Sequence, residues 1–130
     1  MSNFEDVVSP SGNQTWQINQ VTGDSRKFSE YVLVPNHPLG KDKIFLERLG
    51  YRPRNLEDAQ TLLDLYISQA KAQISSGLHR MGEYDRFGQR FTIDIAVRGR
   101  ILLTGWILDD SGILKLATPF AGFSDSEKDL

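Results

Sequence analysis

The stretch VPNHPLGKDK, residues 34–43, contains the residues of this chain best suited to proton transfer and to binding a phosphate. It holds His37, one of only two histidines in the sequence, together with Lys41 and Lys43. Histidine titrates near neutrality and can act as a base or as an acid. Lysine supplies positive charge to a negatively charged transition state. These residue types fit cleavage of RNA at its own 2′-hydroxyl without a metal ion.

Three side chains from the C-terminal half could complete such a site. Arg86 and Arg90 stand at the entrance of a strand-like segment and could stabilise the charge that develops on the phosphorus centre. Thr118 lies in the last expected strand and could hold a phosphate oxygen. The candidate catalytic residues are therefore His37, Lys41, Arg90 and Thr118.

Other kinds of site are disfavoured by what the sequence lacks. It contains no cysteine, no pair of histidines at a metal-binding spacing and no glycine-rich phosphate loop. We therefore expect no cofactor and no metal. The N-terminus does not resemble a signal peptide, and the longest apolar runs are too short to span a bilayer. These features favour a cytoplasmic protein that does not bind membranes.

The charge pattern is compatible with RNA as a partner without requiring it. The net charge is −2, with acidic ends and a mildly basic middle. Dedicated nucleic-acid binders carry a much stronger basic footprint. A non-catalytic module that binds a protein or a nucleic acid, such as a toxin-neutralising or phage-type inhibitor, is therefore the alternative function.

Each candidate residue also has a purely structural explanation. Proline is tolerated at the first position of a helix, so His37 before Pro38 fits a helix cap, and we favour that role. Lys41 and Lys43 are two residues apart and would diverge on a helix. Arginines at strand edges discourage aggregation and need no ligand. Thr118 is an ordinary strand residue.

Two helices are predicted to position these groups. The first begins at Pro38 and ends at Gly50, and its expected buried side chains are Leu39, Phe45, Leu46 and Leu49. The second spans residues 55–76, with Asn55 as its cap and Gly77 at its end. Its apolar residues recur every three or four positions, which indicates one buried face.

After the helices the apolar period changes to two. The segments QRFTIDIAV, RILLTGWIL and ILKLATPF predict an antiparallel meander, with a further short strand over residues 82–86. The run EYVLV predicts a strand ahead of the helices. The fold class is therefore α+β, with two helices on one face of a three- to four-stranded antiparallel sheet. Residues 1–27 form a polar arm expected to be flexible, 28–123 a single domain and 124–130 an acidic tail.

Three segments together resemble a small uncharacterised bacterial domain. They are YVLVPNHPLGKDKIFLERLGY, GEYDRFGQRFTIDIAVRGR and LLTGWILDDSGILKLATPF, within residues 31–120. That domain occurs alone and at the C-terminal tips of large toxins, and it resembles the barnase/EndoU/colicin/RelE-like ribonuclease fold. The matching positions are His37, Pro38, Gly40, Gly88, Trp106 and Thr118. Two departures are Asn36, which directly precedes His37, and the ending LATPF.

The resemblance implies a metal-independent, toxin-related endoribonuclease-like domain that acts on RNA. It also implies a functional lysine in the first of the three segments, and this lysine is Lys41 or Lys43 here. A protein partner such as a cognate antitoxin or toxin would be consistent with it. The implied fold is two helices followed by a four-stranded antiparallel sheet.

Overall fold

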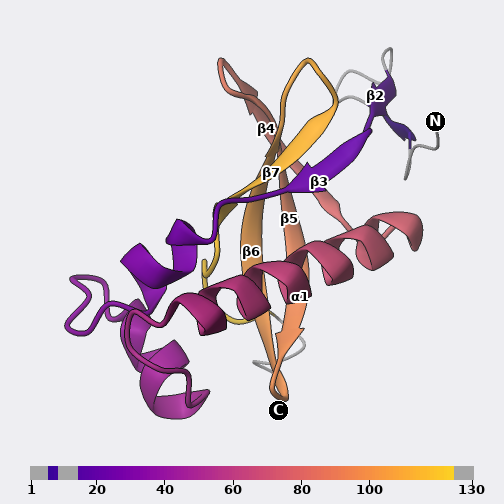
Figure 1. Cartoon of the computed structure of the whole chain (residues 1–130). Helices are drawn as coiled ribbons and strands as arrows, with labels where there is room; N and C mark the ends of the chain where they lie inside the picture. Colours follow the sequence, from indigo (N-terminus) through magenta and orange to yellow (C-terminus); the bar gives the residue numbers. More distant parts are fainter. Residues whose placement is uncertain (1–5, 9–14, 125–130) are drawn as a thin grey trace.

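The computed structural model describes residues 6–8 and 15–124, with side chains described for residues 17–124. Its elements follow one another along the chain as shown in Figure 1. They are β1 (Asp6–Val8), β2 (Thr15–Gln17), β3 (Gln20–Thr22), η1 (Phe28–Val32), η2 (Lys43–Arg48), α1 (Leu56–Ser75), β4 (Arg80–Asp85), β5 (Gly88–Val97), β6 (Arg100–Leu108) and β7 (Ile113–Thr118). The fold is α+β, as predicted.

The main sheet has five strands in the order β3-β7-β6-β5-β4 and is mixed. Strands β4 to β7 are antiparallel, as the alternating pattern predicts, but β3 pairs with β7 in parallel. The prediction of a purely antiparallel sheet of three or four strands is therefore corrected. Strand β3 comes from the polar stretch 1–27, where Ile18 and Val21 are buried in the core. A three-residue strand is too short to show a period of two.

The run EYVLV forms part of a helix, so the prediction of a strand there is wrong. Residues Phe28–Val32 form the short π-helical segment η1, in which Leu33 N–H donates to Phe28 O at 2.9 Å. Phe28, Val32 and Leu33 are fully buried. Val32 and Leu33 follow Phe28 by four and five residues, and this spacing places the three side chains on one side of a helical turn. The run EYVLV does not include Phe28, so the helical spacing cannot be seen from that run alone.

The first predicted helix begins later than expected. Turns occupy the chain around Pro38, and the π-helical segment η2 covers Lys43–Arg48. Leu39, expected in the core, is 71% exposed. Gly50 ends the segment with φ 76°, as predicted. The described chain thus has three helical segments, of which only α1 is long.

Helix α1 agrees with its prediction at both ends. Asn55 Oδ1 accepts the backbone N–H of Asp58 at 2.9 Å, and Gly77 follows the helix with φ 70°. Its buried side chains are Ala59, Leu62, Leu63, Tyr66, Ala70 and Ile74. The Tyr66 hydroxyl donates to Pro119 O at 2.8 Å, and this bond joins the helix to the segment after β7.

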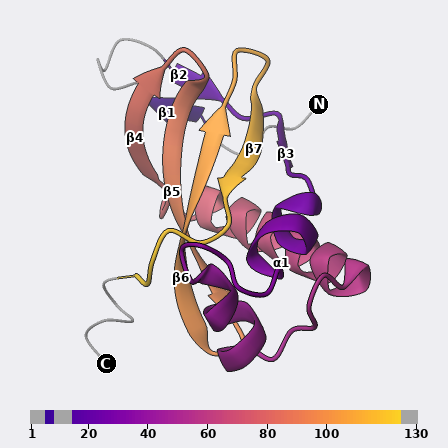
Figure 2. The same ribbon diagram turned by 90° about the vertical axis from the view of Figure 1, so that its left-hand side faces the viewer.

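Helix α1 covers one face of the sheet, and the other face is turned toward the viewer in Figure 2. On the covered face Phe91 of β5 pairs with Trp106 of β6, and both side chains are buried. Trp106 is therefore a core residue. Because side chains alternate along a strand, Arg90 and Thr92 point to the opposite face. We call this opposite side the open face.

Among the described residues, no helix is both long and apolar enough to cross a membrane.

Candidate functional site

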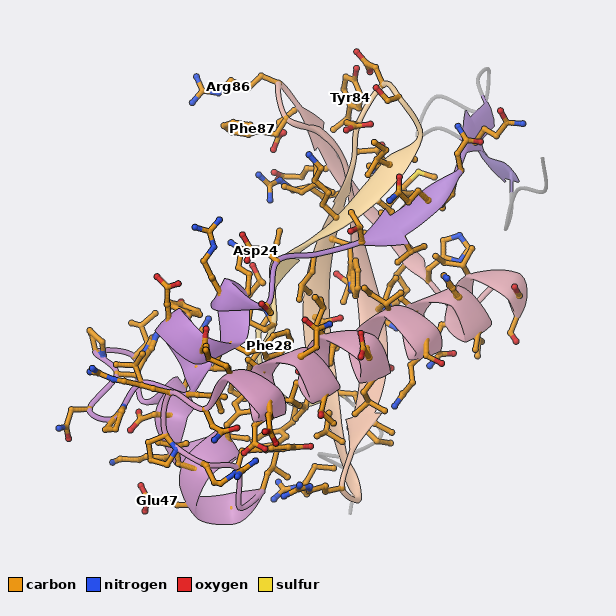
Figure 3. The ribbon with its side chains drawn as sticks, in the orientation of Figure 1. Asp24, Phe28, Glu47, Tyr84, Arg86 and Phe87 are labelled. Atoms are coloured by element: carbon orange, nitrogen blue, oxygen red, sulfur yellow. The ribbon has the colours of Figure 1, made fainter. Side chains whose placement is uncertain are left out.

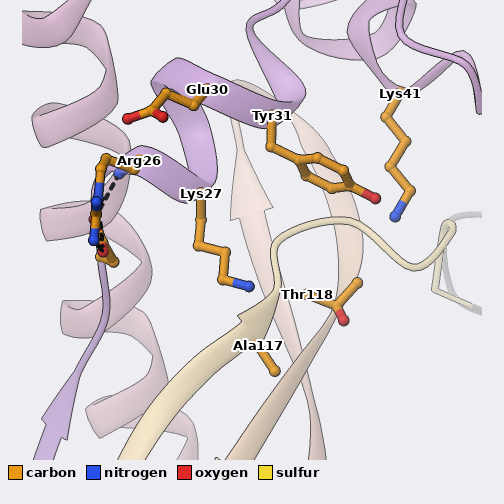
Figure 4. Close-up of a pocket in the computed structure, with 8 residues that line it drawn as sticks. Arg26, Lys27, Glu30, Tyr31, Lys41, Ala117 and Thr118 are labelled. Atoms are coloured by element: carbon orange, nitrogen blue, oxygen red, sulfur yellow. Dashed lines mark hydrogen bonds and ion pairs between the residues drawn. The ribbon is translucent and has the colours of Figure 1, made fainter.

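A pocket of about 520 Å³ lies where η1 meets the end of β7 (Figure 4). Ala117 and Thr118 of β7 line one side of this pocket. Tyr31 of η1 and Lys27, the residue before η1, line another side. Lys41 reaches the pocket from the helical turn that leads into η2. We call this hollow the basic pocket. It combines two ammonium groups with two hydroxyl groups.

A β-bulge shapes the β7 side of the basic pocket. Gly105 of β6 pairs with Thr118, but the next residue, Trp106, pairs with Leu116. Ala117 is therefore the extra residue of a bulge, a feature that often re-aims side chains next to a functional site. The position facing Thr118 is tightly packed, because a Cβ on Gly105 would lie 3.2 Å from Thr118 Cβ and would press on it.

The two lysines give the basic pocket its charge. Neither Lys27 nor Lys41 makes an ion pair with any residue in the described part of the chain. Lys41 Nζ lies 5.1 Å from the centroid of the Tyr31 ring, a cation–π contact that orients the ammonium group. In Figure 4 the side chains of Lys27, Tyr31 and Lys41 extend toward Thr118.

The other charged residues at the rim add little to this charge. Arg26 forms an ion pair with Asp24, with Nη2 and Oδ2 2.6 Å apart. Hydrogen bonds from the Arg26 side chain and then from its backbone lower the pKa of Asp24 to about 2, so this carboxylate stays ionised and balances Arg26. The Glu30 carboxylate points away from Thr118 in Figure 4. The positive charge facing Thr118 therefore comes from the lysines.

His37 lies next to the basic pocket without lining it. Its ring meets the Tyr31 ring edge to face, with centroids 4.4 Å apart. Its Nδ1 accepts the backbone N–H of Leu39 at 3.0 Å, so His37 closes a local turn. The prediction that His37 caps the first helix is therefore wrong, because η2 begins several residues later with Asp42 in the cap position.

The loop that carries His37 is held in place by Asp42. This carboxylate is buried and accepts the backbone N–H groups of Asn36 at 3.0 Å and of His37 at 3.2 Å. Asn36 has a positive φ of 62°, a conformation that asparagine tolerates better than most residues. The sequence Asn-His thus suits a tight turn, and the turn places His37 against Tyr31.

Arg90 lies elsewhere. Its Nε donates to Asp85 Oδ2 at 2.6 Å on the open face, and it does not line the basic pocket. The structure thus brings Lys41 and Thr118 together, places His37 beside them through Tyr31, and leaves Arg90 apart. Arg86 also stands apart, with its guanidinium 4.8 Å from the centroid of the Phe87 ring.

Sequence reasoning missed Lys27 and Tyr31 as candidates. The signal that could have found them is their spacing of four residues, which places two side chains on one face of a helix. This spacing was overlooked because the run EYVLV was predicted to be a strand. No group of three or more histidine, aspartate or glutamate side chains in the described residues is arranged to hold a metal ion.

The sequence matches the family described as "Domain of unknown function (DUF6883)" over residues 15–122. The chain belongs to this family. The match agrees with the predicted resemblance to a small uncharacterised domain, and it extends further toward the N-terminus than residues 31–120, taking in β2 and β3. No curated protein and no solved structure matches the chain.

Proposed function

We propose that this DUF6883 domain is a metal-independent, ribonuclease-like domain that binds the RNA backbone in the basic pocket. The observation that carries the proposal is the pair of ammonium groups, Lys27 and Lys41, facing the hydroxyl group of Thr118. Ammonium groups and hydroxyl donors are common partners of phosphate oxygens. The ribonuclease-like resemblance implies helices followed by four antiparallel strands; the chain has helical segments followed by the antiparallel strands β4 to β7, and it departs from that pattern in the parallel strand β3.

The proposed reaction uses the 2′-hydroxyl of RNA as its nucleophile. A base takes the 2′-hydroxyl proton, the 2′-oxygen attacks phosphorus, the bond from phosphorus to the 5′-oxygen breaks, and an acid protonates that oxygen. Lys27 and Lys41 stabilise the charge on the non-bridging oxygens, and Thr118 donates a hydrogen bond to one of them. The expected products are a 2′,3′-cyclic phosphate and a 5′-hydroxyl.

His37 is the proposed proton-transfer residue. In the free protein its Nδ1 accepts the Leu39 N–H, so the neutral ring carries its proton on Nε2. As the base, His37 exchanges the Leu39 N–H at Nδ1 for the 2′-hydroxyl proton, and the imidazolium that forms gives its Nε2 proton to the 5′-oxygen. Its contact with Tyr31 places the ring at the edge of the basic pocket. Arg90, paired with Asp85, has no place in this version of the site.

The test is cleavage of a labelled single-stranded RNA in EDTA, with end-group analysis of the products. We expect Lys27→Ala and Lys41→Ala each to lower the rate by about 10²–10³-fold, because each removes one stabilising cation. Lys43→Ala is the matched control. It removes the same charge from an exposed position outside the pocket, and the rate should not change.

The same experiment separates catalysis from binding. If wild-type protein binds RNA without cleaving it, the domain is an RNA-binding module and not an enzyme. Wild-type protein that neither binds nor cleaves any RNA would overturn the proposal. A module for a protein partner, such as a cognate antitoxin or toxin, would then take its place.

A further inference from the structure

A second hollow, of about 300 Å³, continues the basic pocket along β7. The two hollows share Lys27 and Ala117 as lining residues. The second hollow adds Lys115, Asp109, the partly buried Ile107 and the aromatic ring of Phe87. Because they share these residues, the two hollows adjoin, and we call the two together the groove; it reaches the turn between β4 and β5.

Phe87 ends this groove as an exposed aromatic ring. It is 56% exposed, and Tyr84 in the same hairpin is 57% exposed, although both are large hydrophobic residues. Figure 3 shows Arg86 and Phe87 projecting from the β4–β5 turn. The Arg86 guanidinium lies 4.8 Å from the centroid of the Phe87 ring, so a cation–π contact already occupies this ring in the free protein.

The turn that carries Phe87 is preorganised. The backbone N–H of Phe87 donates to Asp85 Oδ1 at 2.9 Å, and the other carboxylate oxygen accepts from Arg90. Gly88 has φ 132°, and a Cβ at this position would collide with the carbonyl oxygen of Leu108. Arg90 therefore acts through Asp85 to hold the ring in place, which gives this arginine a positioning role.

Acidic residues border the groove beyond Phe87. Asp109 and Asp110, from the turn between β6 and β7, line a third hollow together with Asp85 and Phe87, and Asp109 also lines the groove itself. Asp109 Oδ1 is occupied by the backbone N–H groups of Ser111 and Ile113. The negative charge of these aspartates disfavours a phosphate beside Phe87. The positive charges of Lys115 and Lys27 favour a phosphate in the part of the groove that they line.

We propose that Phe87 is a stacking platform for one base of single-stranded RNA whose phosphate lies in the basic pocket. The base takes the place of the Arg86 guanidinium on the ring, and Lys115 contacts the phosphate between the two points. Single strands suit this arrangement because their bases are free to stack on aromatic side chains. This inference rests on the proposed function and names its substrate class.

The test uses a short, labelled 2′-O-methyl oligonucleotide, which binds without being cleaved, and a series of versions lacking one base at each position. With wild-type protein, loss of the base at one position should weaken binding by about 5- to 100-fold. Phe87→Ala should weaken binding of the intact oligonucleotide to a similar degree. The affinity of this variant should be the same for the intact oligonucleotide and for the version that lacks that base. Phe87→Tyr should restore both the affinity and the response.

Leu78→Ala is the matched control, because Leu78 is 58% exposed and lies outside the groove. Circular dichroism of each variant verifies the fold. If wild-type protein binds the oligonucleotide and Phe87→Ala responds to every missing base as wild type does, the platform is overturned while the basic pocket stands. If wild-type protein does not bind the oligonucleotide at all, the proposed function fails together with the platform.

Discussion

The ring of His37 meets the ring of Tyr31 edge to face, with 4.4 Å between centroids and 79° between planes. Lys41 Nζ lies 5.1 Å from the centroid of the same tyrosine ring. Tyr31 is thus the residue of η1 that both His37 and Lys41 contact. The stretch of residues 34–43 and the basic pocket therefore meet at the side chain of Tyr31.

His37→Asn separates the structural role of His37 from the proposed chemical role. Asparagine can still accept the Leu39 N–H, so only the ring contact is lost, at a cost of about 0.5–1.5 kcal/mol in unfolding free energy. Loss of the proton-transfer group should lower RNA cleavage by about 10²–10⁴-fold. Urea unfolding and single-turnover cleavage measure the two effects. A variant that keeps the wild-type cleavage rate would remove His37 from the mechanism.

Gly105→Ala should disturb the β7 side of the basic pocket. The new Cβ would lie 3.2 Å from Thr118 Cβ, and such overpacking costs about 1–3 kcal/mol in unfolding free energy. Phosphate affinity should fall as Thr118 shifts. Gly82→Ala in β4 is the control, since its Cβ would meet its nearest neighbour at an ordinary 3.5 Å. Equal stability of the two variants would contradict the close approach of β6 and β7 at Thr118.

Asp24 should titrate far below an ordinary aspartate. The hydrogen bonds from Arg26 lower its pKa from 3.8 to about 2, so the ionised form is favoured in the folded chain. Its stabilising contribution is therefore complete above about pH 4 and is lost as the pH falls toward about 2. NMR titration of the Asp24 carboxyl carbon measures the midpoint. Arg26→Gln should move it back toward 3.8, and a midpoint unaffected by this change would show that the ion pair does not form in solution.

Ile18→Ala should destabilise the domain although Ile18 lies in the polar N-terminal stretch. Its side chain is fully buried, and truncation of a buried isoleucine costs about 2–5 kcal/mol. Leu56→Ala is the matched control, because Leu56 is 75% exposed and its truncation should change the unfolding free energy by less than about 0.5 kcal/mol. Similar values for the two variants, measured by urea unfolding, would show that the segment between β2 and β3 does not belong to the core.

The elements whose signals are local could be predicted from the sequence alone. The cap at Asn55, the regular apolar spacing and Gly77 together predict α1, because each acts within a few turns of one helix. The alternation in β5 and the Arg98-Gly99 turn predict the hairpin with β6, and both turn residues have positive φ, at 45° and 85°. Lys41 and Thr118 were chosen as candidate residues from their chemical types, and their function stays a prediction.

The arrangement of the site was decided only by the tertiary structure. Thr118 faces Lys27 because β7 ends beside η1, and nothing local to either segment specifies that contact. Likewise, β3 is too short to carry a pattern of its own, and its place beside β7 follows from burying Ile18 and Val21 in a core built by distant residues. Arg90 was predicted to contact a phosphate, but in the structure it is the partner of Asp85. Pairing of the β4–β5 hairpin places the Asp85 carboxylate 2.6 Å from the Arg90 guanidinium. Residue types indicate which chemistry is available, but packing between distant segments determines which groups meet.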